Sequence, residues 1–317
     1  MHFGLTLLAL MLAAPALAQD YPTRPIRIVV PAPPGGGTDI LARIIAQKLF
    51  EAWRQQVIVD NRAGASGMIG SEIVARADPD GHTMLVSFTT HVTNPSLYPK
   101  MPYDTVRDFA AVAMAGVIPN VLALHPSLLP QSVKEFIAYA RERPGKLNYG
   151  SAGSGSATHL ATVLFNAMTG TSMVHVPYKG ASPALNDLLA GQVNLMFGNM
   201  ASTLPHVRGD KLRALAVTSA KRSAAAPELP TIAETGLPGY EATGWFALFA
   251  PAKTPTALIN RLNTEIVNGL KQTEVRERML VLGADTYAMT PAELDKYVRA
   301  EIVKWSKVIK ESGAKAD

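Results

Sequence analysis

Two short stretches rich in glycine and hydroxyl residues each lie between a strand-like pattern and a helical pattern. The first follows the apolar run Ile26 to Val30, and the second follows the stretch "KLNYGS" at 146–151. Backbone N–H groups at a helix N-terminus have no partner within the helix, and the helix dipole adds positive potential there. Both stretches therefore favour a site for an anion. Their residues are Gly35, Gly36, Gly37 and Thr38 in the first, and Ser151, Gly153, Ser154, Gly155 and Ser156 in the second.

Neither stretch matches a nucleotide-binding motif. The first lacks both G-x-G-x-x-G with a distant acid and G-K-[ST], and in the second Thr158 replaces the third glycine. Thr38 and Ser156 stand where a helix N-cap is expected. The alternative for each is a tight turn that needs glycine for a left-handed backbone. Two such loops in equivalent positions favour the anion site more than either loop alone.

Four further stretches at predicted strand ends are also small and polar, at 61–67, 88–94, 178–184 and 197–203. Of the six loops, only the first contains a carboxylate, Asp39, and its helical position can turn it away. A cleft of hydroxyl, amide and N–H groups suits a ligand carboxylate. The further candidate ligand-binding residues are Thr89, Thr90, His91, His159, Tyr178, Lys179, Gly180 and Asn199.

Patterns for catalysis and metal binding are weak. There is no G-x-S-x-G motif, and Ser156 and His159, three residues apart, have no orienting acid nearby in the sequence. The seven histidines show no H-E-x-x-H or H-x-H spacing, and the chain has no cysteine. We therefore predict no enzyme activity, no catalytic residue, no metal and no cofactor. His91 and His159 are either polar cleft residues or structural histidines.

The composition indicates a large folded protein that does not bind nucleic acid. The chain has 317 residues, of which 48% are hydrophobic, enough for a large core and two domains. Its net charge is +5, but the longest basic run is the pair Lys221–Arg222, whereas nucleic-acid binders concentrate their charge.

The first 18 residues are typical of a signal peptide. The segment from Phe3 to Ala18 carries no charge and ends in an A-x-A pattern. It is too short to span a membrane, although an uncleaved anchor is the alternative reading. We expect cleavage after Ala18 and a periplasmic protein.

The remaining chain alternates strands and helices in two series. Strands are expected at 26–31, 57–61, 83–88 and 109–116, and again at 146–151, 173–178, 193–198 and 212–217, with helices between most of them. This rhythm predicts an α/β fold of two doubly wound, parallel lobes with a hinge and a central cleft, where ligands bind at the carboxyl ends of the strands. The predicted boundaries are signal peptide 1–18, lobe 1 at 19–118, lobe 2 at 119–243, and lobe 1 again at 244–317, with a return strand and C-terminal helices.

Motifs along residues 21–312 resemble the Bug family of extracytoplasmic solute receptors of tripartite tricarboxylate transporters. They include "RPIRIVVPAPPGGGTDILAR", "VDNRAGASGMIGSEIVARADPDGHTML", "NYGSAGSGSATHL" and "VHVPYKGASPALNDLLAGQVNLMF". The resemblance implies a type II periplasmic-binding-protein fold that closes on a small carboxylate and delivers it to two integral membrane transporter subunits. The family's "PYKG" falls on Tyr178, Lys179 and Gly180, and its two glycine loops fall on the stretches described above.

Two other functions stay open at this point. A carboxylate-sensing receptor would use the same cleft but a signalling partner, and an exported hydrolase would use Ser154 or Ser156 as its nucleophile. We expect the protein to be a monomer. The residues do not identify the carboxylate.

Overall fold

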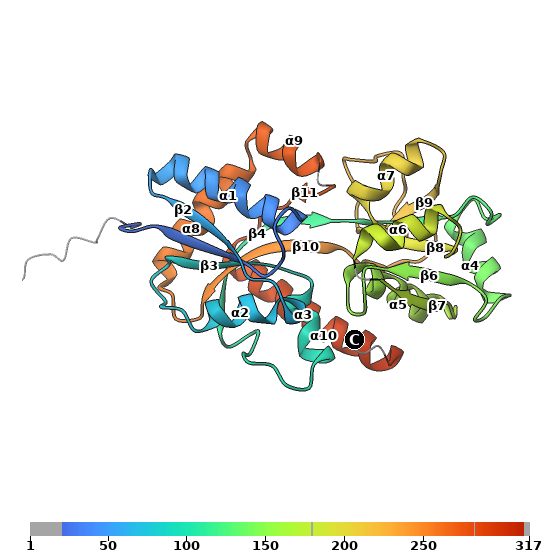
Figure 1. Ribbon diagram of the computed structural model, residues 1–317, viewed down its shortest axis with the longest axis horizontal. Coiled ribbons are helices and arrows are strands. Elements are labelled where there is room, and N and C mark those ends of the chain that lie inside the picture. Colours follow the sequence, from blue (N-terminus) through green and yellow to red (C-terminus); the bar gives the residue numbers. More distant parts are fainter. Residues whose placement is uncertain (1–20, 179, 282, 314–317) are drawn as a thin grey trace, which may run out of the picture.

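Two lobes lie side by side in the computed structural model of the protein (Figure 1). The structure describes residues 21–178, 180–281 and 283–313. The predicted signal peptide, its cleavage site and Lys179 lie outside these residues. Each lobe is a β-sheet covered by helices, so the predicted two-lobed α/β architecture is confirmed.

Lobe 1 is built on a six-stranded mixed sheet. β1 is parallel to β2 and β3, whereas β10 is antiparallel to β3 and β4. The prediction of a parallel sheet therefore holds for β1, β2 and β3 but is wrong for β4 and β10. Since β10 enters from lobe 2 and not through a helical crossover within lobe 1, no right-handed βαβ unit fixes its direction. In spatial order the strands are β11 (Asp285–Thr286), β4 (Phe109–Ile118), β10 (Gly244–Pro251), β3 (Thr83–Phe88), β1 (Ile26–Val30) and β2 (Val57–Asn61).

Lobe 2 has a five-stranded mixed sheet. β6 is parallel to β7 and β8, and β5 is antiparallel to β8 and β9. Sequence patterns did not predict β5, although all five of its residues are buried. A short apolar run that is buried on both faces has no alternation to reveal it. The strand order is β7 (Val174–Pro177), β6 (Asn148–Ser151), β8 (Leu195–Asn199), β5 (Asn120–Leu124) and β9 (Arg213–Val217).

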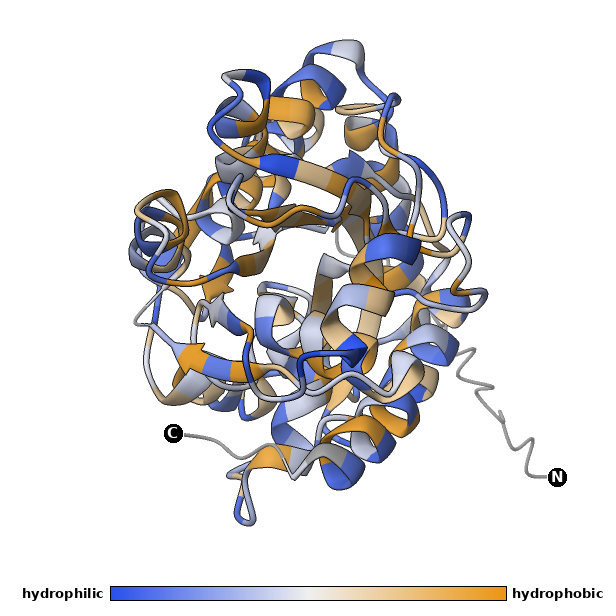
Figure 2. Ribbon diagram, turned by 90° about the vertical axis from the view of Figure 1, so that its right-hand side faces the viewer, coloured by the Kyte–Doolittle hydropathy of each residue, from blue (hydrophilic) through white to orange (hydrophobic). Residues whose placement is uncertain are grey.

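The helices alternate hydrophobic and hydrophilic residues along their length, as Figure 2 shows. This pattern buries one face of each helix against a sheet. The lobe 1 helices are α1 (Gly37–Trp53), α2 (Met68–Ala75), α3 (Thr90–Leu97), α8 (Thr256–Leu270), α9 (Thr273–Val281) and α10 (Pro291–Ser312), with a 3₁₀ turn at Ala65–Gly67. The lobe 2 helices are α4 (Val133–Arg141), α5 (Ala157–Thr169), α6 (Ala181–Leu189) and α7 (Met200–Arg208). None of the helices in the described part of the chain is long and apolar enough to cross a membrane.

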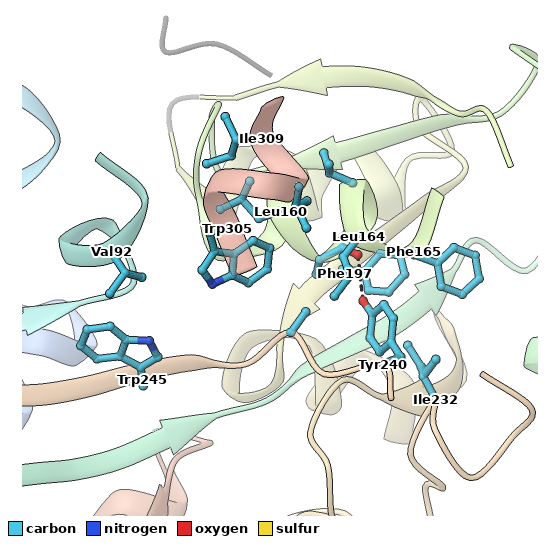
Figure 3. Packing of buried hydrophobic residues seen from close by; sticks show 14 of the residues in the cluster. Val92, Leu160, Leu164, Phe165, Phe197, Ile232, Tyr240, Trp245, Trp305 and Ile309 are labelled. Atoms are coloured by element: carbon cyan, nitrogen blue, oxygen red, sulfur yellow. Dashed lines mark hydrogen bonds between the residues drawn. The ribbon is translucent and has the colours of Figure 1, made fainter. Parts of the chain in front are cut away.

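Two chain segments cross between the sheets. The first is the direct step from β4 to β5, and the second is the segment 218–243 that returns the chain to β10. In that return segment the Tyr240 hydroxyl donates to the Ala161 carbonyl on α5 at 2.8 Å (Figure 3). The return segment is thus held against lobe 2 before β10 begins.

The C-terminal helix α10 contacts both lobes. It packs against α3 and β4 in lobe 1 and against α5 in lobe 2. Trp305 of α10 lies in the same buried cluster as Leu160 of α5 (Figure 3), and its indole N–H donates to Glu301 at 2.7 Å. The assignment of the C-terminal helices to lobe 1 did not anticipate this contact, which makes α10 a third connection between the lobes.

Candidate functional site

Helix N-termini gather at the carboxyl ends of the strands in both lobes. In lobe 1, β1 leads into α1 and β3 into α3; in lobe 2, β6 leads into α5, β7 into α6 and β8 into α7. In open α/β sheets this edge is where ligands bind, because loops and free N–H groups collect there. The two glycine loops are the β1–α1 and β6–α5 connections.

In the first loop the N-cap of the helix lies two residues earlier than predicted. Gly36 is the N-cap of α1, with an extended backbone and no side-chain cap, and Thr38 is already inside the helix and buried. The prediction of Thr38 as the N-cap is therefore wrong. Gly35 has φ +85°, a left-handed conformation that favours glycine.

Asp39 closes this loop from inside the helix. Its Oδ2 accepts hydrogen bonds from the Gly35 N–H at 2.9 Å and from Arg43 Nε at 3.0 Å. Burial opposes ionisation, since the residue is 2% exposed, but the bonds from Arg43 and Gly35 hold the pKa of Asp39 below its usual value. The first loop thus contains its own carboxylate, and the N–H of Gly35 donates to that group.

In the second loop Ser156 is the N-cap of α5, as predicted. Its Oγ accepts from the His159 N–H at 3.3 Å and donates to the Gly153 carbonyl at 2.6 Å. Gly153 and Gly155 have φ values of +117° and +77°. A Cβ on Gly155 would lie 2.5 Å from Cδ1 of Leu97, which belongs to α3 of lobe 1. The second loop therefore touches the opposite lobe directly.

A stack of rings supports the second loop. His159 lies parallel to His175 with ring centroids 4.0 Å apart, and His159 Nδ1 accepts from the Gly155 N–H at 3.0 Å. Ser151 is fully buried, and its Oγ lies 2.6 Å from His175 Nε2. Ser151 and His159 therefore shape the loop. The sequence analysis did not predict a role for His175. Its place in the strand before "PYKG" was the one signal that could have indicated it.

The contacts of Ser156 and His159 differ from those of a nucleophile and its base. The Ser156 hydroxyl contacts the backbone N–H of His159, and the Nδ1 atom of the imidazole is taken by Gly155. A serine nucleophile needs the imidazole itself within hydrogen-bond reach of its oxygen, and a third group to orient that ring.

His91 is a core residue, so its prediction as a cleft residue is wrong. Its ring stacks on Phe249 at 4.3 Å and meets Phe109 edge-on at 5.1 Å. Complete burial lowers the pKa of His91 to about 3. Neither ring nitrogen has a hydrogen-bond partner in the described part of the protein. At neutral pH the ring is an uncharged aromatic packing group.

Most other predicted residues act at helix starts. Asn199 caps α7 by accepting from the Ala201 N–H at 3.0 Å. Gly180 precedes α6 with φ +121°, and Thr89 is the buried residue before α3, which Thr90 begins. These positions place the residues at the binding edge, although the side chain of Asn199 is engaged locally.

Tyr178 directs its hydroxyl toward α6. The hydroxyl donates to Asp187 Oδ2 at 2.7 Å, and burial together with Asp187 raises the pKa of Tyr178 to about 12. The phenol stays protonated at neutral pH and is engaged within lobe 2.

The charge at the start of α1 differs from that at the other helix starts of this edge. The first turns of α3, α5, α6 and α7 contain no acidic residue, whereas that of α1 contains Asp39. Asp39 compensates the positive end of α1, while the helix ends in lobe 2 stay uncompensated. The glycine loop of lobe 2 thus offers a better place for an anionic group than the glycine loop of lobe 1. No group of three histidine, aspartate or glutamate side chains that could hold a metal occurs among the residues with described positions.

Comparisons with known proteins give a consistent match. Residues 41–314 match the model of the tripartite tricarboxylate transporter family receptor. The protein BugT of Bordetella pertussis is 40% identical over 306 residues, which cover 96% of this chain and 94% of BugT.

Solved structures match over nearly the whole chain. Rpa4515 of R. palustris, solved with adipate, is 41% identical and has a TM-score of 0.81, covering 94% of this chain and all of that one. MatC from Rhodopseudomonas palustris, solved with bound malate, is 33% identical with a TM-score of 0.76, covering 91% of this chain and all of that one. The predicted periplasmic-binding-protein fold is thereby confirmed.

Proposed function

Because the chain belongs to the tripartite tricarboxylate transporter receptor family, whose members are solute-binding receptors and not enzymes, we propose that it captures a small carboxylate between its lobes. The observation that carries this proposal is the uncompensated N-terminus of α5. Its glycine loop is held in shape by buried side chains, contains no acid and contacts the other lobe at Leu97. Preorganised N–H donors of this kind suit a carboxylate.

Two similar proteins support a carboxylate of modest size. Rpa4515 is seen with adipate and MatC with malate, and both are dicarboxylates. In this chain we assign one carboxylate to the first turn of α5, where the N–H groups of Ala157 and Thr158 have no acceptor within the helix. The exposed Gly36 and the following Gly37 and Thr38 face the rest of the ligand from lobe 1 in this assignment.

The setting of the protein follows from the same family membership. Family members are periplasmic receptors. We propose that residues 1–18 direct export and are removed after Ala18, and that the loaded receptor passes its ligand to two integral membrane subunits. Closure of the lobes around the ligand would hold it until it is delivered to these subunits.

A thermal-shift screen of the mature protein tests this function. Adipate, malate and other small mono-, di- and tricarboxylates are compared with their neutral amides. A ligand at about 100 times its Kd stabilises the folded protein by roughly 2.7 kcal/mol, which a melting curve detects. We expect at least one acid to raise the Tm while its amide does not. Equal shifts by an acid and its amide would contradict a site built for a carboxylate.

A further inference from the structure

A cavity of about 400 Å³ lies at the junction of the lobes. Its walls come from β4, from both ends of the return segment 218–243, from β11 and the residues after it, and from α10. None of its lining residues belongs to the two glycine loops. The cavity is therefore separate from the proposed carboxylate site. It is lined by the segments that join the lobes.

The walls of this hinge cavity are mainly apolar and aromatic. Val117 of β4 and the rings of Tyr287 and Tyr297 line it. The ring of Tyr297 meets that of Trp245 edge-on, with ring centroids 6.2 Å apart. Such walls suit a ligand with a compact apolar body.

The charges around the cavity favour a cation. Arg222, which lines it, donates to Glu234 at 3.0 Å, so its charge is already balanced. Asp285 accepts a hydrogen bond from the uncharged Ser223 hydroxyl at 2.9 Å, and it forms no ion pair with any residue in the described part of the chain.

Glu241 and Lys221 are the other two charged residues that line the cavity. Glu241 has no hydrogen bond or ion pair with any residue whose position is described. Burial raises the pKa of Tyr297, and the nearby carboxylates of Glu301 and Glu241 raise it further. Among the described residues that line the cavity, Lys221 is the cation without an ion pair, and it stands against the two carboxylates Asp285 and Glu241.

We propose that the hinge cavity binds a small organic ammonium ion with an aromatic or aliphatic body. Its ammonium group would pair with Glu241 and Asp285, and its body would lie against Tyr287 and Tyr297. Tyrosine faces attract cations in addition to providing apolar contact, and a carboxylate strengthens the hydrogen bonds of an ammonium group. An apolar anion would have to place its charge beside both carboxylates.

Occupancy of this cavity is coupled to the arrangement of the lobes. The ligand contacts β4, the return segment and α10, which are the three connections between the lobes. A molecule that fits one arrangement of these segments stabilises that arrangement. The coupling is reciprocal, so a ligand in the main cleft changes the affinity of the hinge cavity by the same factor.

Calorimetric titration of the mature protein with phenethylammonium chloride at low ionic strength tests the proposal, with neutral phenethyl alcohol as the matched probe. We expect saturable binding of one phenethylammonium per chain and much weaker binding of the alcohol. Glu241→Gln should weaken phenethylammonium about tenfold or more. Glu277→Gln, which removes an exposed carboxylate from α9, should bind as the unmodified protein does.

Asp285→Asn is the second variant and protects the test against a folding defect in Glu241→Gln. Melting curves of each variant without ligand identify such a defect. The proposal is overturned by absence of saturable binding, by equal binding of the alcohol, or by unchanged affinity in both folded carboxylate variants. Displacement of phenethylammonium by phenylacetate through Lys221 would show instead that the cavity is an anion site. None of these outcomes depends on whether a carboxylate binds the main cleft.

Discussion

The backbone N–H of Gly35 donates a hydrogen bond of 2.9 Å to the carboxylate of Asp39, four residues later in the first turn of α1. One consequence is that this N–H of the loop has an acceptor within the protein. Another is that a negative charge already occupies the helix end that would otherwise attract an anion. Asp39 thus links the shape of the lobe 1 loop to the choice of the anion site in lobe 2.

Two substitutions separate these roles of Asp39. Asp39→Asn keeps an acceptor for Gly35 and removes the charge, so we expect a carboxylate ligand to bind at least as tightly. Asp39→Ala removes the acceptor, so apo stability should fall by about 1 kcal/mol and binding should weaken several-fold. Calorimetry and urea unfolding measure both effects.

Asp295→Ala is the matched control, because Asp295 forms the equivalent i,i+4 pair with Arg299 on the exposed side of α10. This change should cost no more than about 0.5 kcal/mol. If Asp39→Ala behaved like Asp295→Ala in both measurements, Asp39 would have no role in the loop.

His91 predicts a pH dependence of stability. Its pKa is about 3 in the folded protein and near the ordinary value of 6.5 in the unfolded chain. Between these values the unfolded state binds more protons, so stability falls as the pH drops, by about 1.4 kcal/mol per pH unit from this group. His91→Phe keeps a ring between Phe109 and Phe249 and should lose this part of the dependence.

Urea unfolding at pH 7 and pH 5 checks the His91 prediction. The unmodified protein should lose about 2 kcal/mol more than His91→Phe over this interval. His206→Gln, which changes a partly buried histidine on α7, should retain the full dependence. Parallel pH profiles for His91→Phe and the unmodified protein would show that His91 is not buried in the neutral form.

The contact between Gly155 and Leu97 predicts a specific cost for a methyl group. Gly155→Ala combines a left-handed backbone with a 2.5 Å approach to Leu97 Cδ1. Gly145→Ala has the same backbone strain, with φ +69°, but nothing lies within 4 Å of the added Cβ. Gly145→Ala should cost about 1 kcal/mol, and Gly155→Ala should cost clearly more.

Leu97→Ala in the Gly155→Ala background tests the cause of that difference. Removing the leucine makes room for the methyl group, so the two changes should be strongly non-additive in thermal or urea unfolding. Additive effects would mean that the loop of lobe 2 and α3 of lobe 1 do not touch in solution.

Most strands and loops of the site could be predicted from the sequence. Short apolar runs mark β1, β2 and β3, and the change from glycine to helical spacing marks the starts of α1 and α5. Ser156 as a cap followed from its position before α5, since an N-cap signal is local.

Other features depend on tertiary contacts that no local pattern carries. The antiparallel direction of β10 depends on where the chain re-enters lobe 1, and the span of α10 across both lobes depends on Trp305 meeting α5. His91 follows a strand end like a cleft residue, yet α3 turns its ring into the core. The side-chain direction of such a residue is set by packing and not by spacing.

The central claim is that the N-terminus of α5 holds the ligand carboxylate, and Ala157→Asp tests it most directly. A carboxylate in the first turn of α5 stabilises the helix by about 0.3–1 kcal/mol but repels a bound anion. Calorimetry with the best acid from the screen, beside apo melting curves, should show binding weakened by about tenfold or more with apo stability kept or raised. Ala157→Asn, of the same size without charge, should bind much more tightly than Ala157→Asp. Equal affinities of the Asp and Asn variants would contradict the account, because they would show that no ligand charge lies at this helix end.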